Sequence, residues 1–305
     1  MINTRIAYIE PNSMAKISTA MTLIGSIIAL VISIIAMILL VSSVPQLKSY
    51  ASNNVSLFVI LGIIIGLLIT LIMNYILTYL NALLYNYLLK YFTGIQVELT
   101  PHNEIKEIDI IPTLSINIII SAIWFIIIGI ILFLTFSVVL SALSHVTSVF
   151  GNLNLATITT SSLVVVTLVV LIALIFLGII LVITMFIFNF YARRNPLKLD
   201  ITENNGLELK SIDVMSYVMS IGLTTLTIQL IRTLINIMVG GSMEVALLSI
   251  VNTIAICLIF AAAVPYIYNF IASKFGGLKF DIEPSSNMIQ EYPVTDNLTE
   301  SDIQQ

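Results

Sequence analysis

Six long apolar stretches that are almost free of charge constrain this chain more than any other feature. They cover about residues 14–41, 57–84, 114–140, 161–188, 214–239 and 245–272. Each exceeds the roughly 20 residues that a helix needs to cross a hydrocarbon core of about 30 Å. The chain of 305 residues is 59% hydrophobic and only 9% charged, which is more apolar surface than a soluble domain of this length can bury. The sequence therefore predicts a membrane protein with six spans, and the lipid bilayer is its first expected partner.

The positive charges between the spans predict the orientation of the chain in the membrane. If successive spans alternate in direction, one side receives Arg5, Lys16, Lys90, Lys106, Arg193, Arg194, Lys198, Lys210, Lys274 and Lys279. Lys48 stands alone on the other side. Because Lys and Arg accumulate in cytoplasmic loops, we expect both termini to be cytoplasmic and the chain to be a multi-pass protein of the plasma membrane. The first stretch is too long for a signal-peptide core, so we expect it to remain as a membrane helix.

A triplet of an aromatic residue, Asn and a second aromatic residue ends three of the six stretches. The triplets are Tyr85-Asn86-Tyr87, Phe188-Asn189-Phe190 and Tyr268-Asn269-Phe270, and alternating apolar and polar residues follow them at 95–99, 197–201 and 278–282. A helix-opening residue, Ser13, Thr113 or Ser216, stands near the start of each unit. This register predicts three tandem units of two transmembrane helices each, at 1–100, 101–203 and 204–284. A disordered acidic cytoplasmic tail is expected at 285–305.

The alternating segments predict short strands on the cytoplasmic side, and turn signals such as Asn205-Gly206 predict how they pair. The expected pairs are 95–99 with 104–109, 197–202 with 207–212 and, by pseudo-symmetry, Arg5–Ile9 with Leu278–Glu283. The last pair would close the chain into a ring of three strand pairs under the six helices. The expected fold class is an all-α membrane protein, in which six transmembrane helices form three hairpin repeats with pseudo-threefold symmetry. Short cytoplasmic β-strand pairs complete this fold.

The start of the first unit and the end of the third carry a shared set of motifs. The start has Glu10, Pro11, Ser13 and Lys16, and the end has Tyr268, Asn269, Gly276, Gly277 and Leu278. These motifs resemble an uncharacterised family of actinobacterial membrane proteins, a domain of unknown function with an acid-Pro-x-Ser start, two transmembrane helices, a Tyr-Asn pair and a Gly-Gly-Leu strand. The other unit ends match less fully, since Gly94 stands alone before its strand and Pro196 replaces the glycine. The resemblance implies a two-helix fold, here in three copies, and supplies no activity.

The asparagines of the three triplets, Asn86, Asn189 and Asn269, suggest two hypotheses. In the first, the three amides form a ring at the mouth of a pore. In the second, each amide binds backbone groups where a helix meets a strand. Because a helix that starts near Leu57 crosses the hydrocarbon in about 20 residues, Asn86 lies beyond the hydrocarbon core, which favours the structural hypothesis.

Basic residues follow each triplet, and acidic residues stand at the facing helix starts. The basic residues are Lys90, Arg193, Arg194 and Lys274, and the acidic residues are Glu10, Asp109 and Asp213. We expect these groups to pair with one another or to anchor the helices at the membrane interface.

One ionised residue, Arg232, lies inside a predicted span. Thr225, Gln229, Arg232 and Asn236 follow one another at steps of four, three and four, so they share one face of the fifth helix. A charge at this depth marks a pathway by default, so this face is the candidate intramembrane polar site. Arg232 also lies on the order of 12 Å from the outer turn, close enough to reach Glu244. A structural pair with Glu244 and a role in an ion or anion path both remain open.

Motifs for catalysis, metal binding and cofactor binding are not apparent in the sequence. The single cysteine, Cys257, lies inside a span, and His102 and His145 are predicted on opposite sides of the membrane. That placement excludes a two-histidine metal site within one chain. There is no Gly-rich phosphate loop, nucleophile elbow or basic nucleic-acid patch. We expect a protein that is not an enzyme, with no cofactor, no metal and no nucleic-acid partner.

Two functions are consistent with these features. The first is a non-enzymatic scaffold or accessory subunit of a membrane complex. Its strand layer and tail would bind other membrane proteins or cytoplasmic partners. The second is a narrow ion or small-solute channel or transporter along the pseudo-threefold axis. A conducting path needs polar or small groups on several helices, and only the fifth span has a polar face. The sequence therefore favours the scaffold.

Overall fold

The computed structural model describes most of the chain, and every structural statement below concerns the described residues. These are residues 2–43, 53–146, 155–203, 206–240 and 242–285. The ranges outside them include 44–52 and 147–154, which connect the helices of the first two units, and Asn204-Asn205. Nearly all of the predicted acidic tail also lies outside them.

Long helices arranged as hairpins make up most of the described structure. The first hairpin is α1 (Pro11–Ser43) with α2 (Asn53–Leu88), and the second is α3 (Ile110–Val146) with α4 (Leu155–Ala192). In the third, α5 (Val214–Tyr217), a π-helical turn η3 (Val218–Gly222) and α6 (Leu223–Met238) form one arm, and α7 (Met243–Phe275) forms the other. The described residues contain six helical spans that are long and apolar enough to cross a membrane, as the sequence predicts. The chain is a membrane protein.

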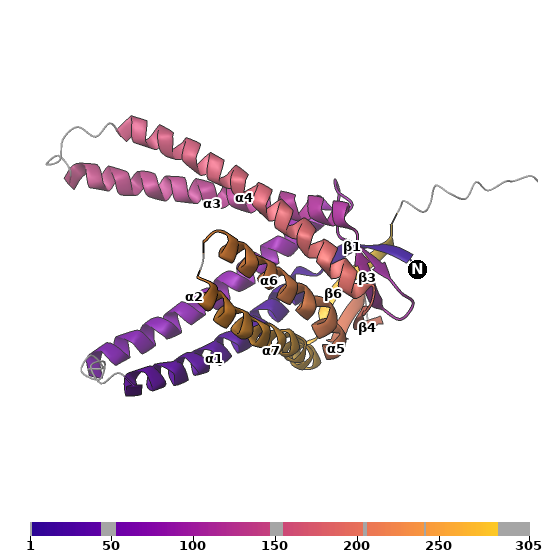
Figure 1. Cartoon of the computed structure of the whole chain (residues 1–305). Helices are drawn as coiled ribbons and strands as arrows, with labels where there is room; N and C mark the ends of the chain where they lie inside the picture. Colours follow the sequence, from indigo (N-terminus) through magenta and orange to yellow (C-terminus); the bar gives the residue numbers. More distant parts are fainter. Residues whose placement is uncertain (1, 44–52, 147–154, 204–205, 241, 286–305) are drawn as a thin grey trace, which may run out of the picture.

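Six strands gather at one end of the helices (Figure 1). They are β1 (Ile2–Ile9), β2 (Gln96–Leu99), β3 (Glu104–Ile108), β4 (Leu197–Glu203), β5 (Leu207–Ile212) and β6 (Leu278–Pro284). The three strand pairs expected from the sequence are present. In the pair that pseudo-symmetry predicts, Arg5 of β1 lies opposite Glu283 of β6.

The predicted all-α fold class with only short strand pairs is wrong, because the strands form one closed antiparallel barrel in the order β1-β2-β3-β4-β5-β6. Three further ladders, β1 with β2, β3 with β4 and β5 with β6, join the expected pairs. Each of these ladders connects strands that a helical hairpin separates in sequence, so no turn signal marks it. A separate pair would leave unpaired N–H and C=O groups along both of its edges, and closure removes those edges.

The apolar core lies at the barrel end of the helices. One buried cluster joins Ile17 of α1 and Ile271 of α7 to Leu209 of β5. Farther from the barrel the hairpins diverge (Figure 1), and neighbouring residues on one helix are both exposed, as with Ile34 at 49% and Ile35 at 53%. Successive residues are about 100° apart around a helix of 3.6 residues per turn, so these outer segments are uncovered on more than one side.

The entry into β6 requires glycine for two reasons. Gly276 has a φ of +84°, a conformation that favours glycine. A Cβ on Gly277 would lie 1.9 Å from the carbonyl oxygen of Leu209. That carbonyl belongs to the β5–β6 ladder, in which Leu209 pairs with Leu278, so it has little freedom to move.

We expect Gly277→Ala to lower the free energy of unfolding by on the order of 1–3 kcal/mol, because the added methyl group overpacks a fixed backbone site. Thermal unfolding of the purified protein in detergent measures this change. Gly25→Ala is the matched control, since nothing lies within 4 Å of the site of its Cβ. It should leave stability unchanged or raise it by up to about 1 kcal/mol through helix propensity. Equal melting temperatures for the two variants would contradict the packing argument.

Candidate functional site

The three triplet asparagines make the same contact at three places around the barrel. Each side-chain amide accepts a hydrogen bond from the N–H of an isoleucine and donates one to the C=O of the same residue. The pairs are Asn86 with Ile9, Asn189 with Ile108 and Asn269 with Ile212, at 2.7–2.9 Å. Each isoleucine is the last residue of a strand, so the amide pairs with it as a neighbouring strand residue would.

A second contact, repeated at each helix start, ties the helix to the barrel. Ser13, Thr113 and Ser216 accept hydrogen bonds from the backbone N–H of Lys279, Gln96 and Lys198, at 3.0, 3.4 and 3.0 Å. The carbonyls of the same three strand residues accept from the N–H groups of Glu10, Asp109 and Asp213. The sequence marks these hydroxyl residues as helix openers, and the structure adds the bond to a strand.

Tyrosine hydroxyls add a bridge at two of the three places. The hydroxyl of Tyr85 donates to the carbonyl of Ile6 and accepts from the N–H of Ile95. Tyr268 donates to Leu209 and accepts from Leu278 in the same way. Phe188 occupies the corresponding position of the second hairpin and has no hydroxyl group. The first residue of the triplet is thus Tyr, Phe and Tyr in the three units, which is visible in the sequence. The hydroxyl bridge itself could not be predicted, because it depends on strands that are distant in sequence.

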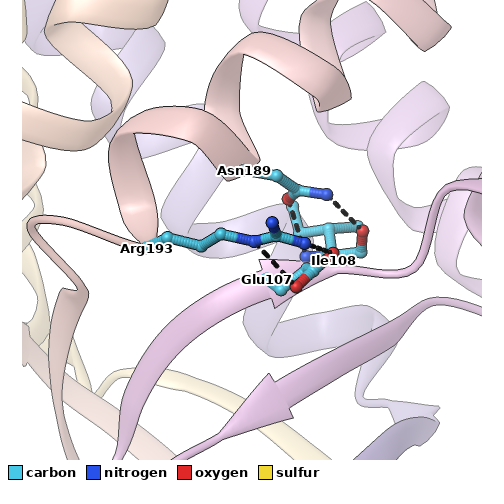
Figure 2. Close-up of polar contacts among 4 residues, drawn as sticks. All are labelled: Glu107, Ile108, Asn189 and Arg193. Carbon is cyan, nitrogen blue, oxygen red and sulfur yellow. Dashed lines mark hydrogen bonds and ion pairs between the residues drawn. The ribbon is translucent and has the colours of Figure 1, made fainter.

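An ion pair distinguishes the second hairpin. Arg193 donates from Nε and Nη2 to the two carboxylate oxygens of Glu107, at 3.1 and 2.7 Å. Figure 2 shows both contacts of this hairpin, with Asn189 against Ile108 and Arg193 against Glu107. The hydrogen bonds and the charge of Glu107 raise the pKa of the Arg193 guanidinium above its usual value, so Arg193 stays positively charged.

The acids at the helix starts are the expected partners of the basic residues, and the structure pairs Arg193 with a strand residue, Glu107, instead. Asn189 holds the end of α4 against Ile108, which places Arg193, one helical turn later, over the neighbouring residue Glu107. The side chain of Asp213 does not pair with a basic residue in the described structure and caps its own helix by accepting from the N–H of Ser216 at 2.7 Å.

The structure places the candidate intramembrane polar site on an open face of α6. Thr225, Arg232 and Asn236 are exposed, and Gln229 is partly buried. The side chain of Glu244 lies outside the described residues, so its predicted pair with Arg232 stays a prediction. The adjacent Thr224 is buried and donates to the carbonyl of Ser220. The face with the buried threonine therefore packs against the protein, and the face with Arg232 does not.

Comparison of the chain with protein-family models, with curated proteins and with solved structures gives no match. The resemblance to an actinobacterial two-helix family stays a prediction.

The repeated contacts of the described residues anchor helices to strands. Within these residues, no group of three or more His, Cys, Asp or Glu side chains lies close enough together to hold a metal ion. The asparagines are occupied by backbone partners and are not free to line a pore. Among the described residues, the exposed face of α6 and the arginines at the end of α4 are two positions available to a ligand or partner.

We expect Asn189→Leu to destabilise the protein, because it leaves the N–H and C=O of Ile108 without partners. An orphaned buried group costs about 1–3 kcal/mol, and Asn189 is only 6% exposed. Denaturant unfolding in detergent micelles measures the loss. The control is Asn236→Leu, which changes an exposed amide on α6 and should leave the unfolding midpoint within error of the wild type. A similar midpoint for both variants would show that the backbone bridge contributes little.

Proposed function

We propose that this chain is a non-enzymatic scaffold or accessory subunit of a membrane complex, with its barrel and both termini in the cytoplasm. The observation that carries the proposal is the exposed polar face of α6, with Thr225, Arg232 and Asn236, at the depth of a membrane span. Lipid tails offer no partners to such groups. In membrane proteins, polar and charged groups at this depth therefore face protein or water.

The apolar surface beside this face supports a partner more than a pathway. Ile231, Leu234 and Ile235 of α6 are exposed at 39%, 56% and 55%. A polar group surrounded by apolar side chains is typical of a helix that packs against another helix in the bilayer, where interhelical hydrogen bonds supply specificity. We propose that a partner helix lies along this part of α6.

The arrangement at the barrel also favours a scaffold. A path along the pseudo-threefold axis would have to pass a closed barrel and the apolar clusters that join the strands to the helices. These contacts instead supply a stable base that fixes where the hairpins leave the barrel. We infer that the three hairpins are copies of one unit, because the asparagine and helix-start contacts recur at each of them.

A photo-crosslinking amino acid at position 235 tests the docking face in native membranes. We expect one discrete adduct with a membrane protein, and we expect Arg232→Ala to reduce its yield at least severalfold because the polar contact is lost. The control is the same label at position 172 of α4, which is 52% exposed but has no polar neighbour among the predicted site residues. Equal and diffuse labelling from both positions would contradict a specific partner.

Flux measurements separate the scaffold from the channel or transporter. We expect the full chain, reconstituted in vesicles, to pass K⁺, Cl⁻ and small polar dyes no faster than vesicles without protein, since a path along the axis would meet the closed barrel and the apolar clusters beside it. A flux above this background that Arg232→Ala abolishes would support the channel or transporter and would overturn the scaffold.

A further inference from the structure

A cleft of about 370 Å³ lies where α4 leaves the membrane span, and its lining combines charge with apolar surface. Arg193 and Arg194 provide two guanidinium groups, while Phe186, Phe190 and Ile110 provide the apolar walls. The guanidinium of Arg194 lies over the ring of Phe190, 4.4 Å from its centroid. Phe186 is 67% exposed, so this wall is open to whatever surrounds the helix.

A separate apolar groove lies along the seam between α3 and α4, about one helical turn from this cleft. The groove has a volume of about 530 Å³ and is lined by Leu114 and Ile118 of α3 and by residues of α4 from Leu174 to Ile183. Leu114 lies one turn beyond Ile110 on α3, and Ile183 lies about one turn before Phe186 on α4. Gly178 lines the groove, and a Cβ at that position would lie 3.3 Å from the end of the Ile118 side chain.

The dimensions fit a lipid that enters with its phosphate at the arginines. Gly178 precedes Arg193 by fifteen residues, which is about 22 Å along a helix that rises 1.5 Å per residue. One leaflet of the hydrocarbon core is about 15 Å deep, half of the roughly 30 Å total. An acyl chain that starts a few ångströms beyond the phosphate therefore passes Phe186 and ends beside the groove near Gly178.

We propose that the cleft and groove bind one anionic phospholipid, with its phosphate on Arg193 and Arg194 and one acyl chain in the α3–α4 seam. Guanidinium groups bind phosphate through charge-assisted hydrogen bonds, and the two arginines immediately follow the membrane span that ends at Ala192. The proposal does not rest on the scaffold function, because this site lies on α3 and α4 and the docking face lies on α6.

Glu107 lowers the net positive charge that the cleft offers to an anion. Its carboxylate takes two of the Arg193 donors and lines the same cleft. The phosphate is left with the remaining donors of Arg193 and those of Arg194, next to a negative charge. The structure therefore implies that Glu107 weakens anion binding, and that its removal strengthens it.

Native mass spectrometry of the full chain in detergent, titrated with dioleoyl-phosphatidylglycerol or dioleoyl-phosphatidylcholine, tests the proposal. We expect the phosphatidylglycerol to bind at least ~10-fold more tightly, because both lipids have the phosphate but the choline of phosphatidylcholine places a cation beside the two guanidinium groups. The double variant with Arg193→Gln and Arg194→Gln should remove this preference, and Glu107→Gln should increase it. Lys90→Gln is the matched control, because Lys90 follows Asn86 at the same spacing as Arg193 follows Asn189; it should change the preference by less than about twofold.

A second pair of variants tests the groove. Gly178→Leu fills the seam and should weaken phosphatidylglycerol binding at least severalfold, whereas Gly129→Leu makes the same change elsewhere on the seam and should not. Thermal unfolding of both variants identifies any loss of binding that comes from misfolding. Soluble glycerol phosphate should compete poorly, since it has no acyl chain.

Three results would overturn the proposal. They are equal affinity for the two lipids, an equal loss of preference in the arginine and Lys90 variants, and displacement of phosphatidylglycerol by glycerol phosphate at equal concentration. The last result would assign the arginines to a soluble phosphate compound. Since none of these measurements involves α6, they leave the scaffold proposal to its own tests.

Discussion

The pairing of a side-chain amide with both backbone groups of one strand residue is the interaction on which the rest of this structure depends. Asn86, Asn189 and Asn269 each make it, and each joins the returning helix of a hairpin to the strand that precedes the same hairpin. A strand end has N–H and C=O groups that need partners, and the membrane helix supplies both from one side chain. This contact joins each returning helix to the barrel at one strand residue, and at the second hairpin it holds Arg193 over Glu107.

The contacts that stabilise the fold and the surfaces that we propose for binding lie in different parts of the molecule. The buried side chains and the repeated hydrogen bonds lie at the barrel end, while the outer helical segments have apolar surface exposed on more than one side. In a bilayer, lipid or another protein covers that surface, so the hairpins need not pack against each other to remain in the membrane. This division leaves the α6 face and the α3–α4 seam available to a partner helix and a lipid without disturbing the core.

The sequence predicted the features that local patterns encode. Six spans follow from apolar length alone, and the β2–β3 and β4–β5 pairs follow from alternation and turns between adjacent segments. The β1–β6 pair required the additional assumption of symmetry. The ladders that join these pairs into a barrel were not predictable in this way, because the β1–β2 ladder, for example, joins Arg5 to Gln96 across a helical hairpin. At the site, helix spacing placed Thr225 and Arg232 on one face, but whether that face is covered depends on packing. The Arg193–Glu107 pair likewise depends on where Asn189 holds its helix.

Because the barrel closes between β1 and β6, it cannot be completed until the last of the six strands has been synthesised. The hairpins can enter the membrane one after another during synthesis, since each is apolar enough on its own. β1, the first strand to be synthesised, has no partner on one of its edges until β6, the last of the six, has been completed. Until then the growing chain has an open sheet with a free edge at the membrane surface. The fold is therefore completed by its final strand, and a chain interrupted before Leu278 would have anchored helices beneath an incomplete sheet.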